Sequence, residues 1–293
     1  MSPVMSIGRV SMRYGSPIPI TAFQGFDAVK DYVQTLDGEG FDFTSTSGHV
    51  LGQPSGTNPQ RPDRQYVGPF YDPMVTFSYL AGVTNRIHFI TAILILPAWP
   101  TALAAKQSAE LAILSRGRLE LGIGISWNAA EYRALGQEIR GRGTRIEEQI
   151  AVLRLLWSKP YVTFEGRYHK LDNVGLNRAD VPPIPIWMGT ESGEAALRRV
   201  ARLSDGWMSL GDPLPEIPRL QQYMREAGRD PSQLKVRGPL VVGDDTTATV
   251  ERARKMAAAG VTHINLVAPP DREPRAALPT IAGARKALRD ALG

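Results

Sequence analysis

The chain has 293 residues and a mass of 32.1 kDa, and 43% of its residues are hydrophobic and 22% charged. These proportions are typical of globular proteins and exclude extensive disorder. Because the sequence contains no cysteine, disulfides, thiolate nucleophiles and cysteine-ligated metals are excluded. The formal net charge is +5, but the basic residues are scattered along predicted helices and form no tail. We therefore expect no nucleic-acid partner, whereas an anionic small ligand stays open.

No segment predicts export or a membrane anchor. Residues 1–20 lack the apolar run of a secretory signal. The most apolar stretch, residues 90–99, is too short to cross a bilayer. We expect a cytoplasmic protein with no membrane partner.

Segments with strand-like and helix-like patterns alternate along almost the whole chain. Asp72 followed by Pro73 is a typical helix start. The continuous apolar run at 87–97 is typical of a strand buried on both faces of a parallel sheet. A small hairpin is predicted over 160–171 with Gly166 in its turn. The other predicted strands lie near residue 10 and at 40–49, 119–126, 184–189, 206–211, 236–243 and 263–269, and the helices at 26–36, 72–84, 102–115, 129–136, 143–158, 192–204, 215–228, 246–259 and 275–291.

Eight strand–helix units with short connections predict a parallel sheet, and in a chain of this length a (β/α)8 TIM barrel. A doubly wound sheet would carry its glycine fingerprint at the first strand–helix turn, and residues 10–30 contain none. We therefore expect a single domain over residues 1–293. Its insertions, near 50–71 and 159–183, are interpreted as following strands. This places them at the C-terminal face of the barrel, where sites of this fold are built.

The pair Gly122-x-Gly124 lies in a predicted strand and raises the question of a dinucleotide loop. Residue 127 is Trp, so the G-x-G-x-x-G pattern is not completed. Both glycines point to one face of the strand. They are better interpreted as space in the barrel wall for a neighbouring strand or a ligand.

A better anion site follows the next predicted strand, in WMGTESGEAALRRVARL. A strand, the loop from Gly189 to Gly193 and then an amphipathic helix offer free backbone N–H groups at a helix N-terminus, where phosphates bind. The alternative is that Thr190 or Ser192 is only a helix cap.

Other enzyme chemistries find little support. The four histidines, at 49, 88, 169 and 263, show no metal-binding spacing, so no metal is expected. Carboxylates for sugar hydrolysis are few, with Glu131, Glu191 and Asp212 as candidates, and no G-x-S-x-G elbow occurs. His49 is the one histidine at a predicted C-terminal strand end, where either a structural or a catalytic role is open.

Several stretches resemble the luciferase-like monooxygenase superfamily and, within it, the oxidoreductases that depend on the deazaflavin coenzyme F420. The similarity covers residues 20 to 210 in order, and the last third of the chain is less distinctive. It is carried by GFDFTSTSGHVLG, DPMVTFSYLAGVTNRIHFITAILILPAWPTALAAKQSAELAILSRGR, SRGRLELGIGISWNAAEYRALG, GTRIEEQIAVLRLLW and PIPIWMGTESGEAALRRVARLSDGW.

The resemblance implies a barrel with insertions that binds the cofactor ring at its C-terminal mouth. The ring would rest against a bulge in the third strand, often with a non-proline cis peptide, which here falls within Ile90–Ile93. His49 matches the family's second-strand histidine and is the expected catalytic residue. Trp99 and Trp127 are expected to line the substrate pocket. The residues expected to bind cofactor are His49, Thr91, Ala92, Ser126, Asn128, Gly189, Thr190, Glu191, Ser192 and Gly193.

The sequence also departs from the family pattern. Many relatives carry Asp before the histidine, where this chain has Gly48, which puts an Asp–His proton relay in doubt. Some deazaflavin dehydrogenases carry a Glu where Trp127 stands, and a common Asp is Ala112 here. In the long loops, Arg61, Arg64 and Arg178 could meet the polyglutamate tail of F420 or be ordinary solvated charges.

The function implied is hydride transfer between F420 and an unidentified small organic substrate. One alternative is an FMN-dependent monooxygenase fed by a separate cofactor reductase. Another is a non-catalytic flavin or deazaflavin-binding protein, because fold alone does not settle function. The resemblance is also compatible with a homodimer, since relatives are often dimers.

Overall fold

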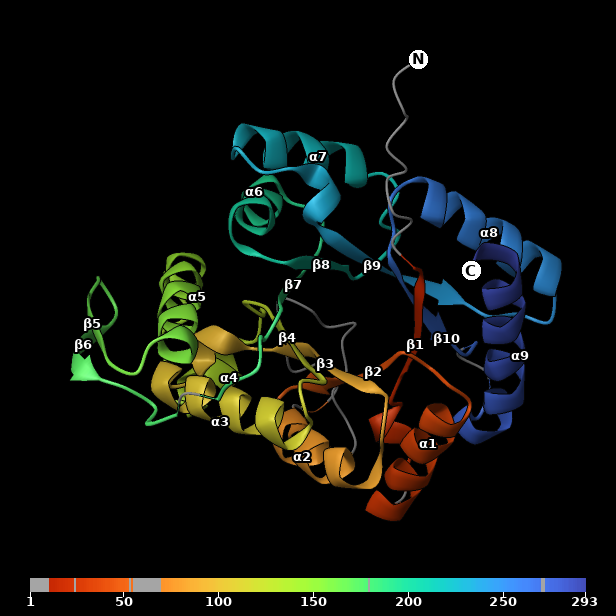
Figure 1. The fold of residues 1–293 in the computed structure, drawn as a ribbon, viewed down its shortest axis with the longest axis horizontal. Helices are drawn as coiled ribbons and strands as arrows, with labels where there is room; N and C mark the ends of the chain where they lie inside the picture. The colour runs from red at the N-terminus through yellow and green to blue at the C-terminus, as the bar shows by residue number, and fades with distance from the viewer. Residues whose placement is uncertain (1–10, 24, 53, 55–69, 179, 270–271) are drawn as a thin grey trace.

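The structure is a computed structural model that describes residues 11–23, 25–52, 54, 70–178, 180–269 and 272–293. Eight parallel strands close into a barrel with helices around it (Figure 1). This confirms the predicted (β/α)8 fold. In barrel order the strands are β1 (Arg13–Pro17), β10 (His263–Val267), β9 (Lys235–Val241), β8 (Gly206–Ser209), β7 (Ile186–Thr190), β4 (Leu119–Ile123), β3 (His88–Leu94) and β2 (Phe43–Gly48).

Each barrel strand leads into at least one helix, as the eight predicted units require. Asp72 caps the second of these helices by accepting a hydrogen bond from the Val75 backbone N–H at 2.9 Å, and Pro73 occupies its first turn. The first strand begins later than predicted, because Arg13 is the first residue of β1 that pairs with β10. The helices are α1 (Phe26–Gly38), α2 (Pro73–Val83), α3 (Thr101–Leu114), α4 (Ala129–Ala134), α5 (Arg142–Ser158), α6 (Glu194–Leu203), α7 (Ile217–Glu226), α8 (Thr246–Ala258) and α9 (Pro274–Leu292), with short 3₁₀ turns at Ile20–Ala22, Leu96–Ala98 and Pro231–Gln233.

The interior of the barrel is a packed core and not a channel. Its middle layer consists of Phe43, Ile90, Trp187 and Met208, all nearly or fully buried. These side chains come from β2, β3, β7 and β8 and meet at one level inside the closed sheet. The layer separates the two ends of the barrel.

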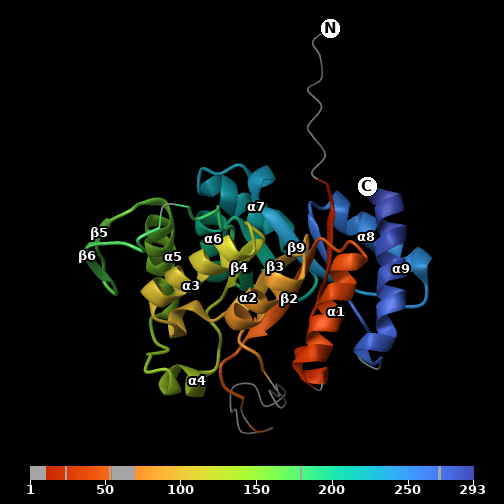
Figure 2. The ribbon, with the colours of Figure 1, turned by 60° about the horizontal axis from the view of Figure 1, so that its bottom comes forward.

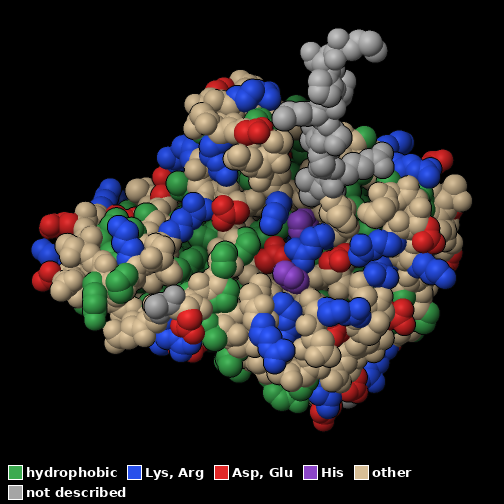
Figure 3. Space-filling model, viewed as in Figure 1, with side chains coloured by type: hydrophobic (Ala, Val, Ile, Leu, Met, Phe, Trp, Pro, Cys, Tyr) green, Lys and Arg blue, Asp and Glu red, His purple; other side chains and the backbone are tan. Residues whose placement is uncertain are grey.

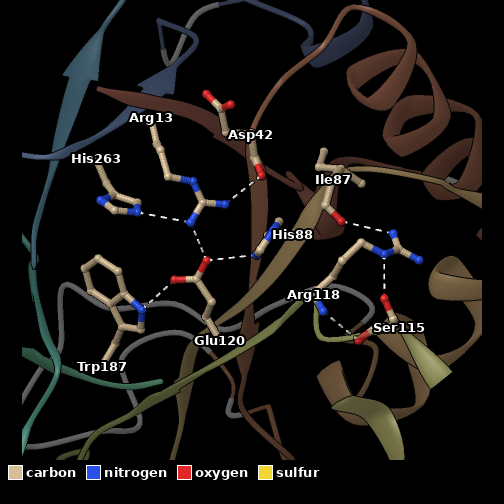
Figure 4. A network of polar contacts seen from close by, with 9 residues as sticks. All are labelled: Arg13, Asp42, Ile87, His88, Ser115, Arg118, Glu120, Trp187 and His263. Carbon is tan, nitrogen blue, oxygen red and sulfur yellow. Dashed lines mark hydrogen bonds and ion pairs between the residues drawn. The ribbon is translucent and has the colours of Figure 1, made fainter. Parts of the chain in front are cut away.

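A charged cluster closes the N-terminal end of the barrel around Glu120 (Figure 4). This carboxylate accepts hydrogen bonds from Arg13 at 2.5 Å and from the Trp187 indole N–H at 2.7 Å, and lies 3.1 Å from His88 Nδ1. Burial by itself would raise the pKa of Glu120, but His88 and Arg13 outweigh it and hold the pKa well below its usual range. Histidine, basic and acidic side chains gather near the middle of this face (Figure 3). The cluster is a structural plug.

Arg118, in the connection between α3 and β4, bonds this connection to the segment between α2 and β3. Its guanidinium is buried and donates five hydrogen bonds, four of them to backbone carbonyl groups, and Figure 4 shows those to Ile87 and Ser115. The acceptors are the carbonyls of Ala81, Thr84, Ile87 and Ser115 and the Thr84 hydroxyl. The carbonyls of Ala81, Thr84 and Ser115 lie at the C-terminal ends of α2 and α3, where helix geometry leaves carbonyl groups unpaired.

The second insertion does not leave the barrel where the sequence suggested. Residues 159–183 follow α5 and precede β7, so they connect a helix to a strand and start from the N-terminal end. They form the predicted hairpin, β5 (Val162–Glu165) and β6 (Lys170–Val174), beside α5 (Figure 1). Its turn reaches back along α5, where His169 lies 2.7 Å from Glu148 and 2.6 Å from the Thr101 hydroxyl. The expectation that this insertion follows a strand was therefore wrong.

Candidate functional site

A cavity of about 330 Å³ lies above the apolar layer at the C-terminal mouth of the barrel. Figure 2 shows this end at the bottom of the molecule, on the side of α4. The cavity is formed by the upper ends of β1, β2, β3, β8, β9 and β10. Its lining consists of Pro17, Ile18, Ser45, Thr46, Ser47, Ala92, Ile93, Met208, Ser209, Leu210, Arg237, Pro239 and Asn265. This is the face on which barrel enzymes build their sites.

Strand β3 bulges into this mouth. Its register against both β2 and β4 shifts before Leu94, and the Ala92–Ile93 peptide bond is cis. Both features fall where the resemblance placed them. Ala92 and Ile93 line the cavity. Thr91 is fully buried, and its hydroxyl donates to the Gly122 carbonyl at 2.6 Å and accepts from the Gly122 N–H at 2.8 Å. The Thr91 side chain thus belongs to the barrel wall.

Glycines on β4 and β7 make room for the bulge. A Cβ on Gly122 would collide with the carbonyl oxygen of Thr91. A Cβ on Gly124 would lie 2.8 Å from the side chain of Ile93, and one on Gly189 would collide with the same side chain. The interpretation of Gly122 and Gly124 as space in the barrel wall is confirmed, and the neighbour they accommodate is β3.

His49 follows β2 directly and forms a pair with Glu131 of α4. Its Nδ1 lies 2.9 Å from the Glu131 carboxylate, and the His49 side chain is 12% exposed. The other Glu131 oxygen accepts a hydrogen bond from the Val50 backbone N–H at 2.5 Å. Glu131 is almost completely buried. The carboxylate therefore fixes the imidazole orientation and favours a proton on Nδ1.

The His49–Glu131 pair replaces the Asp–His pair that Gly48 put in doubt. A Cβ at Gly48 would lie 2.7 Å from the carbonyl oxygen of Ile93, so the β3 bulge leaves no room for the family's aspartate there. Glu131, 82 residues further along the chain, supplies the carboxylate instead. The sequence singled out Glu131 only as a carboxylate for sugar hydrolysis. Glu131 lies three residues after Asn128 at a predicted helix start, and this spacing was the one sequence signal that could have placed its carboxylate at the mouth.

The loop after β4 positions Glu131. Asn128 is buried and caps α4, because its side-chain oxygen accepts from the backbone N–H groups of Ala130 and Glu131 at 3.0 and 3.2 Å. Ser126 is half-buried and has a positive φ of 49°. The Trp127 ring lies 6.4 Å from the His49 ring. Asn128 thus acts on the site through α4, whereas Trp127 borders His49 itself.

Trp99 has a different environment from Trp127. It packs against a small apolar cluster of Ile95, Ala98 and Tyr132, and Ile93 contacts the same cluster. Its indole nitrogen is buried without a hydrogen-bond partner. Trp99 does not line the cavity, and neither do Trp127 or His49. Trp99 thus shares this cluster with Ile93 of the bulge.

The loop between β7 and α6 is open to solvent. Glu191, Ser192 and Gly193 are exposed, and the Thr190 hydroxyl donates to the Glu191 carbonyl at 2.9 Å. No side chain caps the N-terminus of α6, and a Cβ at Gly193 would meet nothing within 4 Å. Neither Thr190 nor Ser192 therefore acts as the helix cap, and free N–H groups remain at a helix N-terminus.

The basic loop residues are only partly described. Arg61 and Arg64 lie outside the described residues. Arg178 forms an ion pair with Asp180 at 3.0 Å and lies 3.8 Å from Glu110, so its charge is already matched. Within the described part of the chain, no cluster of three or more potential ligands for a metal ion occurs. No helix among the described residues is long and apolar enough to cross a membrane.

Sequence comparison gives the family to which this barrel belongs. Residues 4–291 match the family model of the luciferase-like monooxygenases. The chain therefore belongs to the luciferase-like monooxygenase family.

Individual relatives carry different descriptions. An uncharacterised protein of Mycobacterium tuberculosis is 38% identical over 55% of this chain and 57% of its own length. The F420-dependent hydroxymycolic acid dehydrogenase of the same organism is 29% identical over 76% of this chain and 61% of its own. The FMNH2-dependent dimethylsulfone monooxygenase of Pseudomonas fluorescens is 35% identical over 52% of this chain and 42% of its own. The chain thus matches little more than half the length of the first of these curated relatives.

Solved structures share the fold at low sequence identity. An F420-dependent secondary alcohol dehydrogenase, solved with an F420–acetone adduct, superposes with a TM-score of 0.80. The alignment covers 96% of this chain and all of that one, at 16% identity. The coenzyme F420-dependent tetrahydromethanopterin reductase of Methanopyrus kandleri gives 0.70 at 15% identity, covering 96% and 98%. These matches agree with the observed barrel.

Proposed function

We propose that the protein is an F420-dependent oxidoreductase that acts on a small organic substrate. The observation that carries the proposal is the arrangement at the mouth, where the β3 bulge and the His49–Glu131 pair lie together. The relative named as an F420-dependent dehydrogenase supports the choice of cofactor. When bound, the deazaflavin supplies two-electron hydride chemistry.

The residues present fit such a cofactor at two places. The exposed loop from Gly189 to Gly193 ends at a helix N-terminus without a side-chain cap, which suits a phosphate. At the bulge, the small Ala92 side chain and Ile93 offer an apolar wall for a flat ring. The side chains of Thr91 and Asn128 would contribute only indirectly, because both are engaged with backbone groups.

His49 would hold or deliver the proton that accompanies hydride transfer to or from a carbonyl group or an activated double bond. With Glu131 holding Nδ1, Nε2 is the ring nitrogen that would exchange the proton. Glu131 is then a positioning residue and His49 the catalytic one. Trp127, close to the His49 ring, would help to shield that imidazole from water.

The first experiment is equilibrium binding of oxidised F420 and of FMN to the purified protein, followed by fluorescence. We expect micromolar or tighter binding of F420, with FMN weaker by about tenfold or more. The reverse preference would move the protein to the flavin-dependent monooxygenases. If neither cofactor binds, the proposed function is refuted while the barrel stands.

The role of His49 is tested with His49→Ala and reduced F420. Turnover is followed with a panel of ketones, aldehydes and enones as the return of deazaflavin fluorescence. We expect turnover to fall by about 100-fold, within the usual contribution of a general acid, and F420 affinity to change little. If only the affinity for F420 falls and turnover does not, His49 binds the cofactor and is not catalytic. No turnover of any compound by the wild type would favour a non-catalytic binding protein.

An FMN-dependent monooxygenase is the second candidate function. The specific observation in its favour is the 35% identity to the FMNH2-dependent dimethylsulfone monooxygenase. In that case a separate reductase would be a partner. Oxygen consumption with chemically reduced FMN and a panel of sulfones and thioethers tests this alternative. The cytoplasmic location and the absence of nucleic-acid binding stay predictions from the sequence.

A homodimer is proposed through α2. This helix contains no charged residue, and it exposes Val75 by 69% and Tyr79 by 48%, one turn apart. Such a stripe is typical of a covered surface. Light scattering should give twice the mass of 32.1 kDa, and Val75→Glu with Tyr79→Glu should give a monomer. Tyr161→Glu, at an equally exposed position in the hairpin, is the control.

A further inference from the structure

Arg237 of β9 is a buried arginine whose charge is poorly matched. Its side chain points into the barrel, where Nη2 donates to the Ser45 hydroxyl at 2.8 Å and Nη1 contacts the Met208 sulfur at 3.1 Å. The guanidinium also stacks 5.5 Å from the centre of the Phe43 ring. Its Nε is buried without a hydrogen-bond partner. A hydroxyl and a thioether are weak partners for a guanidinium, which favours carboxylate or phosphate oxygens.

No carboxylate in the described part of the chain forms an ion pair with Arg237. Glu120 acts on it only through space, and that carboxylate is already bonded to Arg13 and Trp187. Burial lowers the pKa of Arg237 to about 10, so the side chain stays charged at neutral pH. A buried charge without a counter-charge is costly, and such a group usually has a ligand or a role in the site.

Two further unmatched polar atoms line the same cavity as Arg237. The Thr46 hydroxyl oxygen and the Asn265 amide oxygen are buried and have no hydrogen-bond partner. Thr46 comes from β2, across the barrel interior, and Asn265 comes from β10, which pairs directly with β9. Buried polar groups in folded proteins are nearly always satisfied. Among the described residues, three of the eleven buried side-chain atoms without a partner belong to residues that line this one cavity, so a single polar ligand could satisfy all three.

We propose that this cavity binds the anionic group of the substrate, a carboxylate, on Arg237. The Thr46 hydroxyl donates to the same carboxylate, as does the Asn265 amide after rotation about its last bond. The rest of the lining includes Ile18, Ile93 and Leu210, so the substrate is an organic acid with a short apolar body. This inference names the substrate class for the proposed function, and rests on that function only for the reaction.

Benzoate and benzamide test the inference, because they match in shape and differ in charge. Calorimetric titration of the wild type, in buffer brought to equal ionic strength with chloride, should detect benzoate and not benzamide. Arg237→Met should weaken benzoate binding by about tenfold or more, the effect of losing a charge-assisted hydrogen bond. Arg202→Met is the matched control, because it removes an exposed charge paired with Glu147. Thr46→Val, which keeps the charge, should weaken binding by a few-fold and serves if Arg237→Met does not fold.

Several outcomes would overturn the inference. Equal binding of benzoate and benzamide, or unchanged benzoate affinity in both Arg237→Met and Thr46→Val, would leave Arg237 a structural residue. F420 affinity is measured on the same variants. If Arg237→Met weakens F420 binding and the wild type does not bind benzoate, the guanidinium contacts the cofactor ring and the proposed substrate class is wrong. If benzoate binds through Arg237 but F420 does not bind, the anion site stands and the proposed function falls.

Discussion

Acid should destabilise this protein through His263, which lies in the charged cluster at the N-terminal end of the barrel. The side chain is 2% exposed, its Nε2 lies 3.3 Å from Arg13, and its Nδ1 lies 2.8 Å from the Thr262 hydroxyl. Burial, and the neighbouring Arg13 after it, lower the pKa of His263 from 6.5 to about 3, although Glu120 opposes the shift. The folded protein therefore holds this histidine neutral, while the unfolded chain takes up a proton below pH 6.5.

The sign and size of the effect follow from linkage. The unfolded state binds more protons between pH 6.5 and 3, so stability is complete above that window and is lost as the pH falls through it. One proton corresponds to about 1.4 kcal/mol per pH unit. At pH 5 the free energy of unfolding should therefore be about 2 kcal/mol lower than at pH 7.5 from His263 alone.

The matched variant is His263→Gln, whose amide oxygen can accept the hydrogen bond from Arg13. Urea unfolding is measured from pH 7.5 to 5 for both proteins. The wild-type midpoint should fall by about 0.7 M more than that of the variant, for an m-value of about 3 kcal/mol/M. Parallel pH dependence of the two proteins, or a His263 NMR resonance that titrates near pH 6.5 in the folded state, would refute the reasoning.

The remaining predictions concern the site and its supports. Glu131→Gln should lower kcat about tenfold or more through misorientation of His49, with the KM and F420 affinity unchanged; an equal change in all three would point to general disruption. Gly48→Ala should lower the unfolding free energy by about 1–3 kcal/mol, because its Cβ meets a backbone carbonyl, whereas Gly211→Ala, which meets nothing, should be nearly neutral. Arg118→Met should cost about 3 kcal/mol in urea unfolding, since it leaves buried carbonyls unpaired; a loss below 1 kcal/mol would contradict this.

Local sequence patterns were enough for the elements of the barrel. The alternation of apolar strands with amphipathic helices predicted the eight units, and the bounds of α5 and α8 agree with it to within a residue or two. Asp72 with Pro73 marked a helix start, and Gly166 marked the hairpin turn. These features depend on hydrogen bonds and burial within a few residues, so a short window of sequence carries them.

The position of the second insertion shows where local reasoning failed. The sequence predicted the hairpin itself, but its attachment depends on contacts of His169 with Glu148 and Thr101, 21 and 68 residues away. The bulge in β3 was expected only from family resemblance. Its physical basis is the space left by Gly124, just after β4, and by Gly189 on β7, and only the closed barrel shows this.

The sequence by itself determined the barrel, its family resemblance and the candidate His49. Only the tertiary structure decided which groups act together. The partner of His49 lies 82 residues away, and the cavity around Arg237 takes side chains from strands at opposite ends of the chain. Local periodicity records which face of an element is buried, but closing the barrel decides what that face meets. The chemistry of the mouth is therefore a property of the closed sheet and not of any one motif.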